Sequence, residues 1–235
     1  MKEKIKDIDT LKSENKELKK EINDLKNKIN LLERKNIDNN NVKDKLEMDK
    51  SMIIKENEED MIILEIEKRM NKQIKKLKKL YQATVDGGDS KNFHLKCDNI
   101  PNTLVLIKSE GERRFGGFTT IPWKSEEEFV MDSKMTTFVF SLDTKKIYNL
   151  KSINENAVYH CINSGPCFGN GRDIALDGNP IKENTLFTNK FSFDYQEDNQ
   201  PLSEYYSYNR GKVVEYEVYQ ILFIVKNGRI FISNK

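Results

Sequence analysis

The first 80 residues of this 235-residue chain contain no aromatic residue, glycine, proline, cysteine or histidine. All 12 Phe, 9 Tyr, 11 Gly, 5 Pro, 3 Cys and 2 His, and the one Trp, lie at or after Tyr81. A segment without aromatic or turn-forming residues cannot build a mixed core, so it forms a long helix or stays disordered. The remainder has the length of one ordinary domain. The composition therefore divides the chain at Leu80–Tyr81.

Other features that the sequence lacks exclude whole classes of protein. No run of about 18 apolar residues is present, so no transmembrane helix is expected. The first residues, Met1-Lys2-Glu3-Lys4, lack the apolar region of a secretory signal. Three cysteines cannot form a closed disulfide set, and no Asn-x-Ser/Thr sequon occurs. These absences favour a reduced, cytoplasmic location. The net charge of +2 is too weak to indicate nucleic-acid binding.

A heptad repeat over residues 5–36 predicts helix pairing. Apolar or Asn residues recur at alternating spacings of three and four: Ile8, Leu11, Asn15, Leu18, Ile22, Leu25, Ile29, Leu32 and Asn36. A 3.5-residue period keeps this seam on one side of a helix and drives supercoiling. Isoleucine at the a positions with leucine at the d positions favours two parallel helices, and a buried Asn fixes their register.

The charges that flank the seam favour a parallel homodimer. The g positions are Asp7, Glu14, Glu21 and Lys28, and the e positions five residues later are Lys12, Lys19, Lys26 and Glu33. All four pairs attract in a parallel dimer, whereas an antiparallel dimer would place lysines opposite one another. A DNA-binding zipper needs a long basic helix before the seam, and this seam begins too early for one. We expect a homodimer and no DNA binding.

The heptad phase ends at residues 37–41, which we interpret as a hinge because Asn and Asp compete for backbone hydrogen bonds. A second helix is expected over residues 42–80, so that 1–80 form one coiled-coil region. Its end is basic, with Lys68, Arg69, Lys72, Lys75, Lys76, Lys78 and Lys79. A solvated helix face is the ordinary explanation of such a block. Contact with anionic lipid or RNA through Lys68–Lys79 is an alternative.

From Tyr81 onward, short β-rich runs alternate with turn residues. Strands are expected at 103–107, 115–119, 137–142, 157–162 and 213–225, and a short helix over 90–97 that Ser90 would cap. Several strands with few helices predict an α+β fold, with long N-terminal helices followed by a two-layer sandwich.

These runs carry a family resemblance over about residues 80–225. Its pieces, in order, are Leu80-Tyr81-Gln82-Ala83, Asp86-Gly87, Phe93-His94-x2-Cys97-Asp98, Thr103 to Lys108, Phe115-Gly116-Gly117-Phe118-Thr119, Trp123, Phe138 with Phe140, Gly165-Pro166-Cys167-Phe168-Gly169-x-Gly171-x-Asp173, and Val214 to Gln220. Together they resemble a TLDc domain, which we assign to residues 81–225. Asn170 and Arg172 depart from the usual signature. Residues 226–235 form an extension, in which Asn227-Gly228 predicts an extra hairpin strand.

The resemblance implies an antiparallel two-sheet sandwich with flanking helices. It also implies an oxidative-stress context or a protein partner, such as a subunit of a vacuolar-type proton ATPase. The family offers no agreed active site to transfer. The motif residues themselves have structural explanations. Gly116 and Gly117 allow close backbone approach. Gly165, Gly169 and Gly171 are expected in conformations closed to other residues, with Pro166 stiffening the turn. Trp123 is expected in the core.

Cysteine and histidine supply the remaining candidates for chemistry. Cys97, Cys161, Cys167, His94 and His160 lack the spacing of a zinc site, and no cofactor or catalytic set is assigned. Cys167 lies in a turn-rich segment, which makes it the candidate redox thiol if it is exposed. The sequence thus favours a non-enzymatic, dimeric interaction protein. The alternative is a thiol-based redox protein or an enzyme that uses Cys97 or Cys167 with a histidine.

Overall fold

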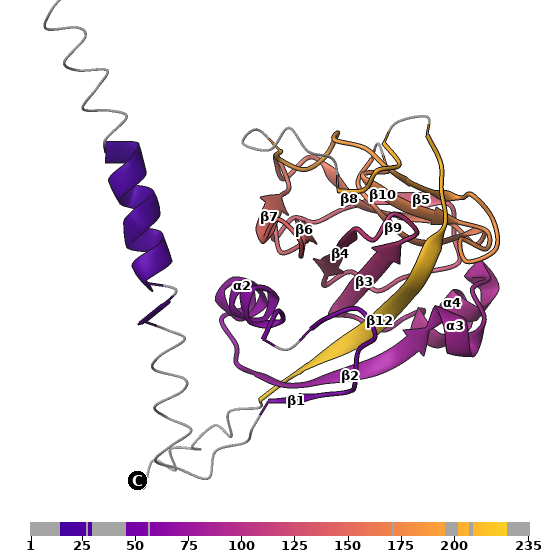
Figure 1. Ribbon diagram of the computed structural model, residues 1–235, viewed down its shortest axis with the longest axis horizontal. Helices are drawn as coiled ribbons and strands as arrows, with labels where there is room; N and C mark the ends of the chain where they lie inside the picture. Colours follow the sequence, from indigo (N-terminus) through magenta and orange to yellow (C-terminus); the bar gives the residue numbers. More distant parts are fainter. Residues whose placement is uncertain are drawn as a thin grey trace, which may run out of the picture. The chain divides into compact units, whose positions relative to one another are not determined.

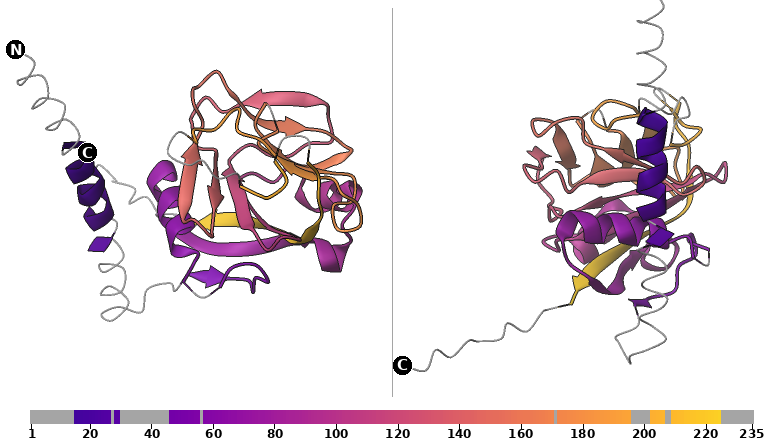
Figure 2. Two further views of the ribbon diagram at one scale, coloured as in Figure 1. Left: turned by 45° about the horizontal axis from the view of Figure 1, so that its top comes forward. Right: turned by 90° about the vertical axis from the view of Figure 1, so that its left-hand side faces the viewer.

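A computed structural model describes residues 15–26, 28–29, 46–55, 57–170, 172–195, 202–206 and 209–224 (Figures 1 and 2). The chain divides into two compact units, residues 1–45 and residues 46–235.

The described part of the first unit is a helix over residues 15–26 that continues at 28–29. Leu18, Ile22, Leu25 and Ile29 are each between 51% and 56% exposed. The helix expected here is therefore confirmed, and four aliphatic side chains of the seam are open in the single chain. Pairing of two helices stays a prediction. The ends of the seam, including Ile8, Leu11, Leu32 and Asn36, and the hinge at 37–41 lie outside the described residues.

The second unit is an α+β fold. Its helices are α2 (Asp60–Met70), α3 (Ala83–Asp86) and α4 (Ser90–Cys97). Its strands are β1 (Glu47–Met48), β2 (Ile74–Gln82), β3 (Thr103–Ser109), β4 (Arg114–Thr119), β5 (Glu128–Met131), β6 (Phe138–Ser141), β7 (Lys146–Asn149), β8 (Asn156–His160), β9 (Ser164–Phe168), β10 (Ile174–Asp177), β11 (Leu186–Thr188) and β12 (Val213–Phe223).

The described strands form two sheets. The first has seven strands in the order β1-β2-β12-β3-β4-β6-β7, and the second has five in the order β11-β10-β9-β8-β5. All neighbours pair antiparallel except β1 and β2, which are parallel. Strand β12 lies between β2 and β3, so the last of the described strands joins β1 and β2 to the rest of the first sheet (Figure 1).

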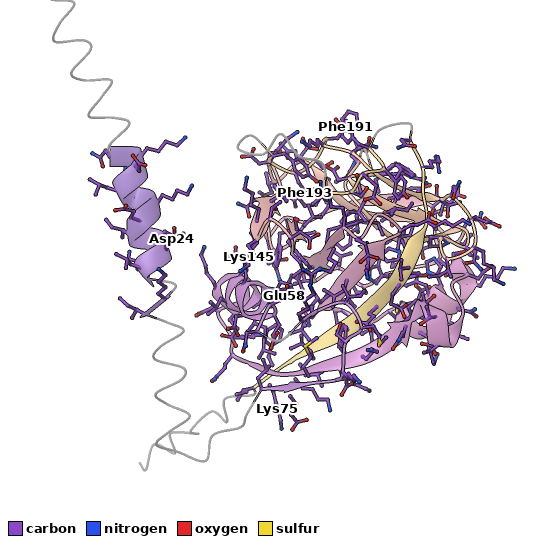
Figure 3. The ribbon with its side chains drawn as sticks, in the orientation of Figure 1. Asp24, Glu58, Lys75, Lys145, Phe191 and Phe193 are labelled. Carbon is purple, nitrogen blue, oxygen red and sulfur yellow. The ribbon has the colours of Figure 1, made fainter. Side chains whose placement is uncertain are left out.

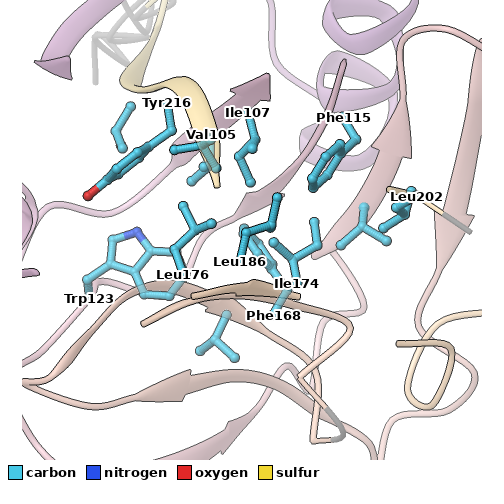
Figure 4. Packing of buried hydrophobic residues seen from close by; sticks show 14 of the residues in the cluster. Val105, Ile107, Phe115, Trp123, Phe168, Ile174, Leu176, Leu186, Leu202 and Tyr216 are labelled. Atoms are coloured by element: carbon cyan, nitrogen blue, oxygen red, sulfur yellow. The ribbon is translucent and has the colours of Figure 1, made fainter. Parts of the chain in front are cut away.

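One apolar core lies between the two sheets (Figure 4). Val105, Ile107 and Tyr216 of the first sheet pack there with Phe168 and Leu176 of the second, and all five are fully buried. A second cluster covers the opposite face of the first sheet, where α2 packs. The unit therefore has three layers, with α2 on the first sheet and the first sheet on the second.

The helix expected over residues 42–80 is wrong for most of its length. Only α2 is helical within the described part of this range, and it ends where Asn71 adopts a left-handed conformation (φ 47°). Residues 74–82 form β2. Its register with β12 shifts at Lys75 and again at Leu80, so Ile74 and Leu77 share one face despite a three-residue spacing. Such bulges give a strand the apolar spacing of a helix.

The boundary placed at Leu80–Tyr81 is also wrong. Residues from Leu46 onward belong to the second unit, because Ile53 and the buried isoleucines of α2 cover the outer face of the first sheet. Farther along the chain, the strands and the helix expected after Tyr81 are present within two residues of the expected bounds. Asp89, not Ser90, caps α4, since its side chain accepts the Lys91 N–H at 3.0 Å. The C-terminal extension, 226–235, lies outside the described residues.

Candidate functional site

The paired glycines of the family motif lie where the backbone has no room for a side chain. A Cβ on Gly116 would meet the carbonyl oxygen of Val105 at 2.0 Å. A Cβ on Gly117 would meet the ring of Phe168 at 2.7 Å, from the opposite sheet. Phe115 is buried between the sheets and Phe118 on the other face of the first sheet. This motif therefore sets the distance between the sheets.

Trp123 joins several motif residues within the core, as expected. It is 1% exposed, and its indole N–H donates to Thr103 Oγ1 at 2.9 Å. Its ring packs edge-on against Phe93 of α4 (5.7 Å) and Phe168 of β9 (5.5 Å). Phe93 and Cys97 are fully buried on the same face of α4. These contacts hold α4 against the edge of both sheets.

His94 and Asp98 form a fixed hydrogen-bonded pair that ends α4. His94 Nδ1 lies 2.7 Å from Asp98 Oδ1, and the hydroxyl of Ser125 donates to Asp98 Oδ2 at 2.6 Å. His94 Nε2 lies 2.9 Å from the carbonyl oxygens of Cys161 and Ser164, so this nitrogen carries a proton and donates. A ring that donates here is not available as a general base at that nitrogen.

His160 differs from His94, because neither of its ring nitrogens has a hydrogen-bond partner among the described residues. It is 2% exposed and packs edge-on against Trp123 at 6.4 Å. Burial lowers the pKa of this imidazole below its ordinary value of 6.5, because the charged form is poorly solvated. His160 is thus a neutral core residue at neutral pH.

The segment from Gly165 to Asp173 braces a loop. Gly169 has a left-handed backbone (φ 83°), as expected, but Gly165 does not, and an added Cβ there would make only ordinary contacts from 3.5 Å. Gly171 lies outside the described residues, and Pro166 and Phe168 lie in β9. Asp173 is fully buried and accepts the backbone N–H groups of residues 191–193. Burial raises the pKa of Asp173 despite these bonds. Phe191 and Phe193 mark this loop in Figure 3.

Cys167 does not meet the condition of exposure on which its role as a redox thiol depends. Cys167 and Cys97 are completely buried, and Cys161 is 8% exposed. Burial raises the pKa of both Cys97 and Cys167, which disfavours the reactive thiolate. Cys167 lies in β9 because the segment after Ser164 continues the sheet and does not form an open loop. The preconditions for a redox thiol or a nucleophilic cysteine are therefore missing at these two positions.

Two buried carboxylates that the sequence analysis missed hold the N-terminal part of the domain. Glu217 of β12 is fully buried and accepts from the hydroxyl of Ser51 (2.6 Å), the N–H of Met52 (3.0 Å) and the ammonium of Lys79 (2.7 Å). Glu215 accepts the N–H of Thr84 at 3.1 Å. Acidic residues that alternate with apolar ones are typical of a strand with one solvent-exposed face, so the sequence alone gives no sign that both glutamates are covered.

The basic block at 68–79 is not one helix face. Arg69 pairs with Glu65 and donates to the carbonyl of Met135, and Lys76 pairs with Glu47 and Asp49. Lys79 pairs with Glu217. Lys75, labelled in Figure 3, and Lys78 are exposed on β2. Arg69, Lys76 and Lys79 are therefore held in ion pairs within the fold, and the block is not the continuous helix face on which lipid or RNA contact was suggested.

The described part of the chain holds no group of three or more His, Cys, Asp or Glu side chains placed to bind a metal ion. Among its helices, none combines the length and apolarity needed to cross a bilayer.

The described side chains thus define an α+β domain whose motif residues build a core and its loops. The family model for the TLDc domain matches residues 47–222, so the chain belongs to the TLDc family. This match begins at β1, in agreement with the domain start seen in the structure. No curated protein matches the chain.

Proposed function

We propose that this TLDc protein is a non-enzymatic, cytoplasmic interaction module that pairs through its N-terminal helix and contacts a protein partner through its domain. The observation that carries the proposal is the stripe of Leu18, Ile22, Leu25 and Ile29, each about half exposed in the single chain. Aliphatic side chains at this spacing are buried when a second helix packs on them. The free, buried thiols suit a reduced compartment.

The domain contributes the partner contact in this proposal. Its family is linked to oxidative-stress resistance and to vacuolar-type proton ATPases. We therefore infer a partner in that context, a subunit of such an ATPase being the first candidate. Pairing of two chains raises the effective concentration of the second domain once the first is bound, so a weak surface gains avidity.

Sedimentation of the full chain at tens of micromolar tests the pairing. We expect twice the chain mass for the wild type and for Lys20→Asp, which changes the f position opposite the seam. Leu18→Asp buries a charge in the seam and should sediment as a monomer. A monomeric wild type would refute the pairing.

Affinity purification with the same three chains tests the partner. If the folded wild type recovers no ATPase subunit, that result argues against the proton-pump context.

A further inference from the structure

One row of side chains crosses the outer face of the second sheet. Phe129 pairs with Tyr159, and Ala175 pairs with both Cys167 and Phe187. The pairing of Val158 with Phe168 places Cys167 beside Tyr159. The strand neighbours of these residues lie in the core between the sheets, so the row belongs to the outer face. Cys167, Ala175 and Phe187 are buried there in a small cluster of their own, whereas Phe129 is 44% exposed. The row has rings at its two ends and small side chains at its centre.

Two guanidinium groups lie on these rings. The Cζ atom of Arg172 lies 5.1 Å from the ring centre of Tyr159 and 5.9 Å from that of Phe187. The Cζ atom of Arg210 lies 4.4 Å from the ring centre of Phe187. Phe129 stacks on Tyr159 at 4.4 Å. Aromatic and arginine side chains grouped in this way are typical of the centres of protein interfaces.

Charge divides this face into two ends. Residues 126–128 are exposed glutamates around the start of β5, and Glu127 alternates with Phe129 on this face. At the other side, Arg172 and Arg210 share the single carboxylate of Asp177, at 3.1 and 3.3 Å. Glu127 and Asp177 lie at about the same height along the strand direction. Glu128 pairs with His160 and Asp177 pairs with Ser164, and these two partners lie at the same end of the neighbouring strands β8 and β9. The face is acidic at β5 and basic near β11.

Such a face is complementary to itself. A two-fold axis that runs parallel to the strands, in front of β9 and midway between the two faces, exchanges β5 with β11. It places Phe129 of one copy over the guanidinium groups that lie on Phe187 of the other, and Glu127 over Arg210. We propose that the outer face of the second sheet binds the same face of a second copy of this chain. The inference rests on the helix pairing proposed above, which supplies the second copy.

Size and chemistry favour this occupant over others. Five strands spaced by about 4.8 Å give a face roughly 20 Å wide. The area that such a face can bury is smaller than the interface area of a stable dimer that has no other contact. A tether to a paired helix makes the contact intramolecular, with an effective concentration of the order of millimolar. Single-stranded RNA needs free ring faces for stacking. Here guanidinium groups already lie on Tyr159 and Phe187.

Disulfide trapping in the full chain tests the face. The variant Glu127→Cys/Arg210→Cys, oxidised mildly at a concentration where the wild type sediments as a dimer, should give a covalent dimer on a non-reducing gel. Each single variant should give none, because each position meets the other position of the partner, and an equal mixture of the two single variants should give it again. Glu127→Cys/Leu95→Cys is the collision control, since Leu95 is 82% exposed on α4.

The outcomes separate the two proposals. A dimer by sedimentation without trapping overturns the face and leaves the helix pairing intact. A monomer without trapping overturns both. Trapping in the helix variant Leu18→Asp at higher concentration supports the face alone. If cross-linking in cells gives a covalent product whose mass is not twice the chain mass, another protein occupies this face and the proposal is overturned.

Charge reversal in the chain without introduced cysteines is the independent check. Glu127→Arg and Arg210→Glu should each weaken the dimerisation affinity roughly three- to tenfold, and the double reversal should restore it.

Discussion

At the scale of single residues, two glycines of the family motif meet opposite surroundings. Gly116→Ala brings its new Cβ within 2.0 Å of a backbone oxygen, which cannot move without separating β3 from β4. We expect this variant to lose about 3 kcal/mol of unfolding free energy. Gly165→Ala finds its nearest neighbours at 3.5 Å and has no left-handed backbone to strain, so its stability should be unchanged or rise by up to about 1 kcal/mol. Urea denaturation of both measures the difference. Equal losses would contradict the packing described for Gly116.

His160 gives the domain a stability that depends on pH. Its pKa is lowered in the folded state, so the unfolded chain binds more protons below its ordinary value of 6.5. The contribution is therefore fully present above about pH 6.5 and is lost as the pH falls toward the folded-state value, with a slope of at most about 1.4 kcal/mol per pH unit. Between pH 7.5 and pH 5.5 the unfolding free energy should decrease more in the wild type than in His160→Phe. Equal declines would show that His160 does not carry the effect.

At the scale of elements, β2 shows where sequence reasoning succeeds and where it fails. Strands β3, β4, β6, β8 and β12 were predictable, because they lie within runs of strand-forming residues. Strand β2 was not, since its bulges at Lys75 and Leu80 convert a strand into a helix-like pattern of Ile74 and Leu77. A bulge depends on the partner strand β12, more than 130 residues away, and one sequence contains no signal of that register.

The same limit applies to side chains of the candidate sites. The burial of Trp123 and the close approach at Gly116 follow from residue type, so both were predictable. The exposure of Cys167 was not, because it depends on which strand the segment joins. Glu217 is a similar case, since its role needs Ser51 and Lys79 to meet it from distant parts of the chain.

The segment of residues 49–54 should depend on Glu217. In Glu217→Gln the ammonium of Lys79 loses its charged partner within a buried site, and the hydroxyl of Ser51 loses a charged acceptor. We expect about 3 kcal/mol less stability and faster hydrogen exchange at the amides of residues 52–54. Glu126→Gln is the matched control, because among the described residues Glu126 forms its ion pair with the exposed Lys124 and should change stability by less than about 0.5 kcal/mol. Unchanged exchange at these amides in Glu217→Gln would refute the anchoring role.

At the scale of the whole molecule, the orientation of the helix pair decides whether both domains leave it from the same end. Glu21 at a g position and Lys26 at the following e position attract across a parallel dimer, and two-fold symmetry makes two such pairs. Glu21→Lys turns both contacts into repulsions, which should cost about 1–2 kcal/mol and weaken dimerisation roughly tenfold. Lys26→Glu should weaken it similarly, and the double variant Glu21→Lys/Lys26→Glu should recover wild-type affinity, because the pairs attract again with reversed signs. Dilution series by sedimentation measure all four chains. In an antiparallel dimer Lys26 would face the other e positions, most of which are lysines, so Lys26→Glu would strengthen the pairing. That result would contradict the parallel orientation and place the two domains at opposite ends of the helix pair.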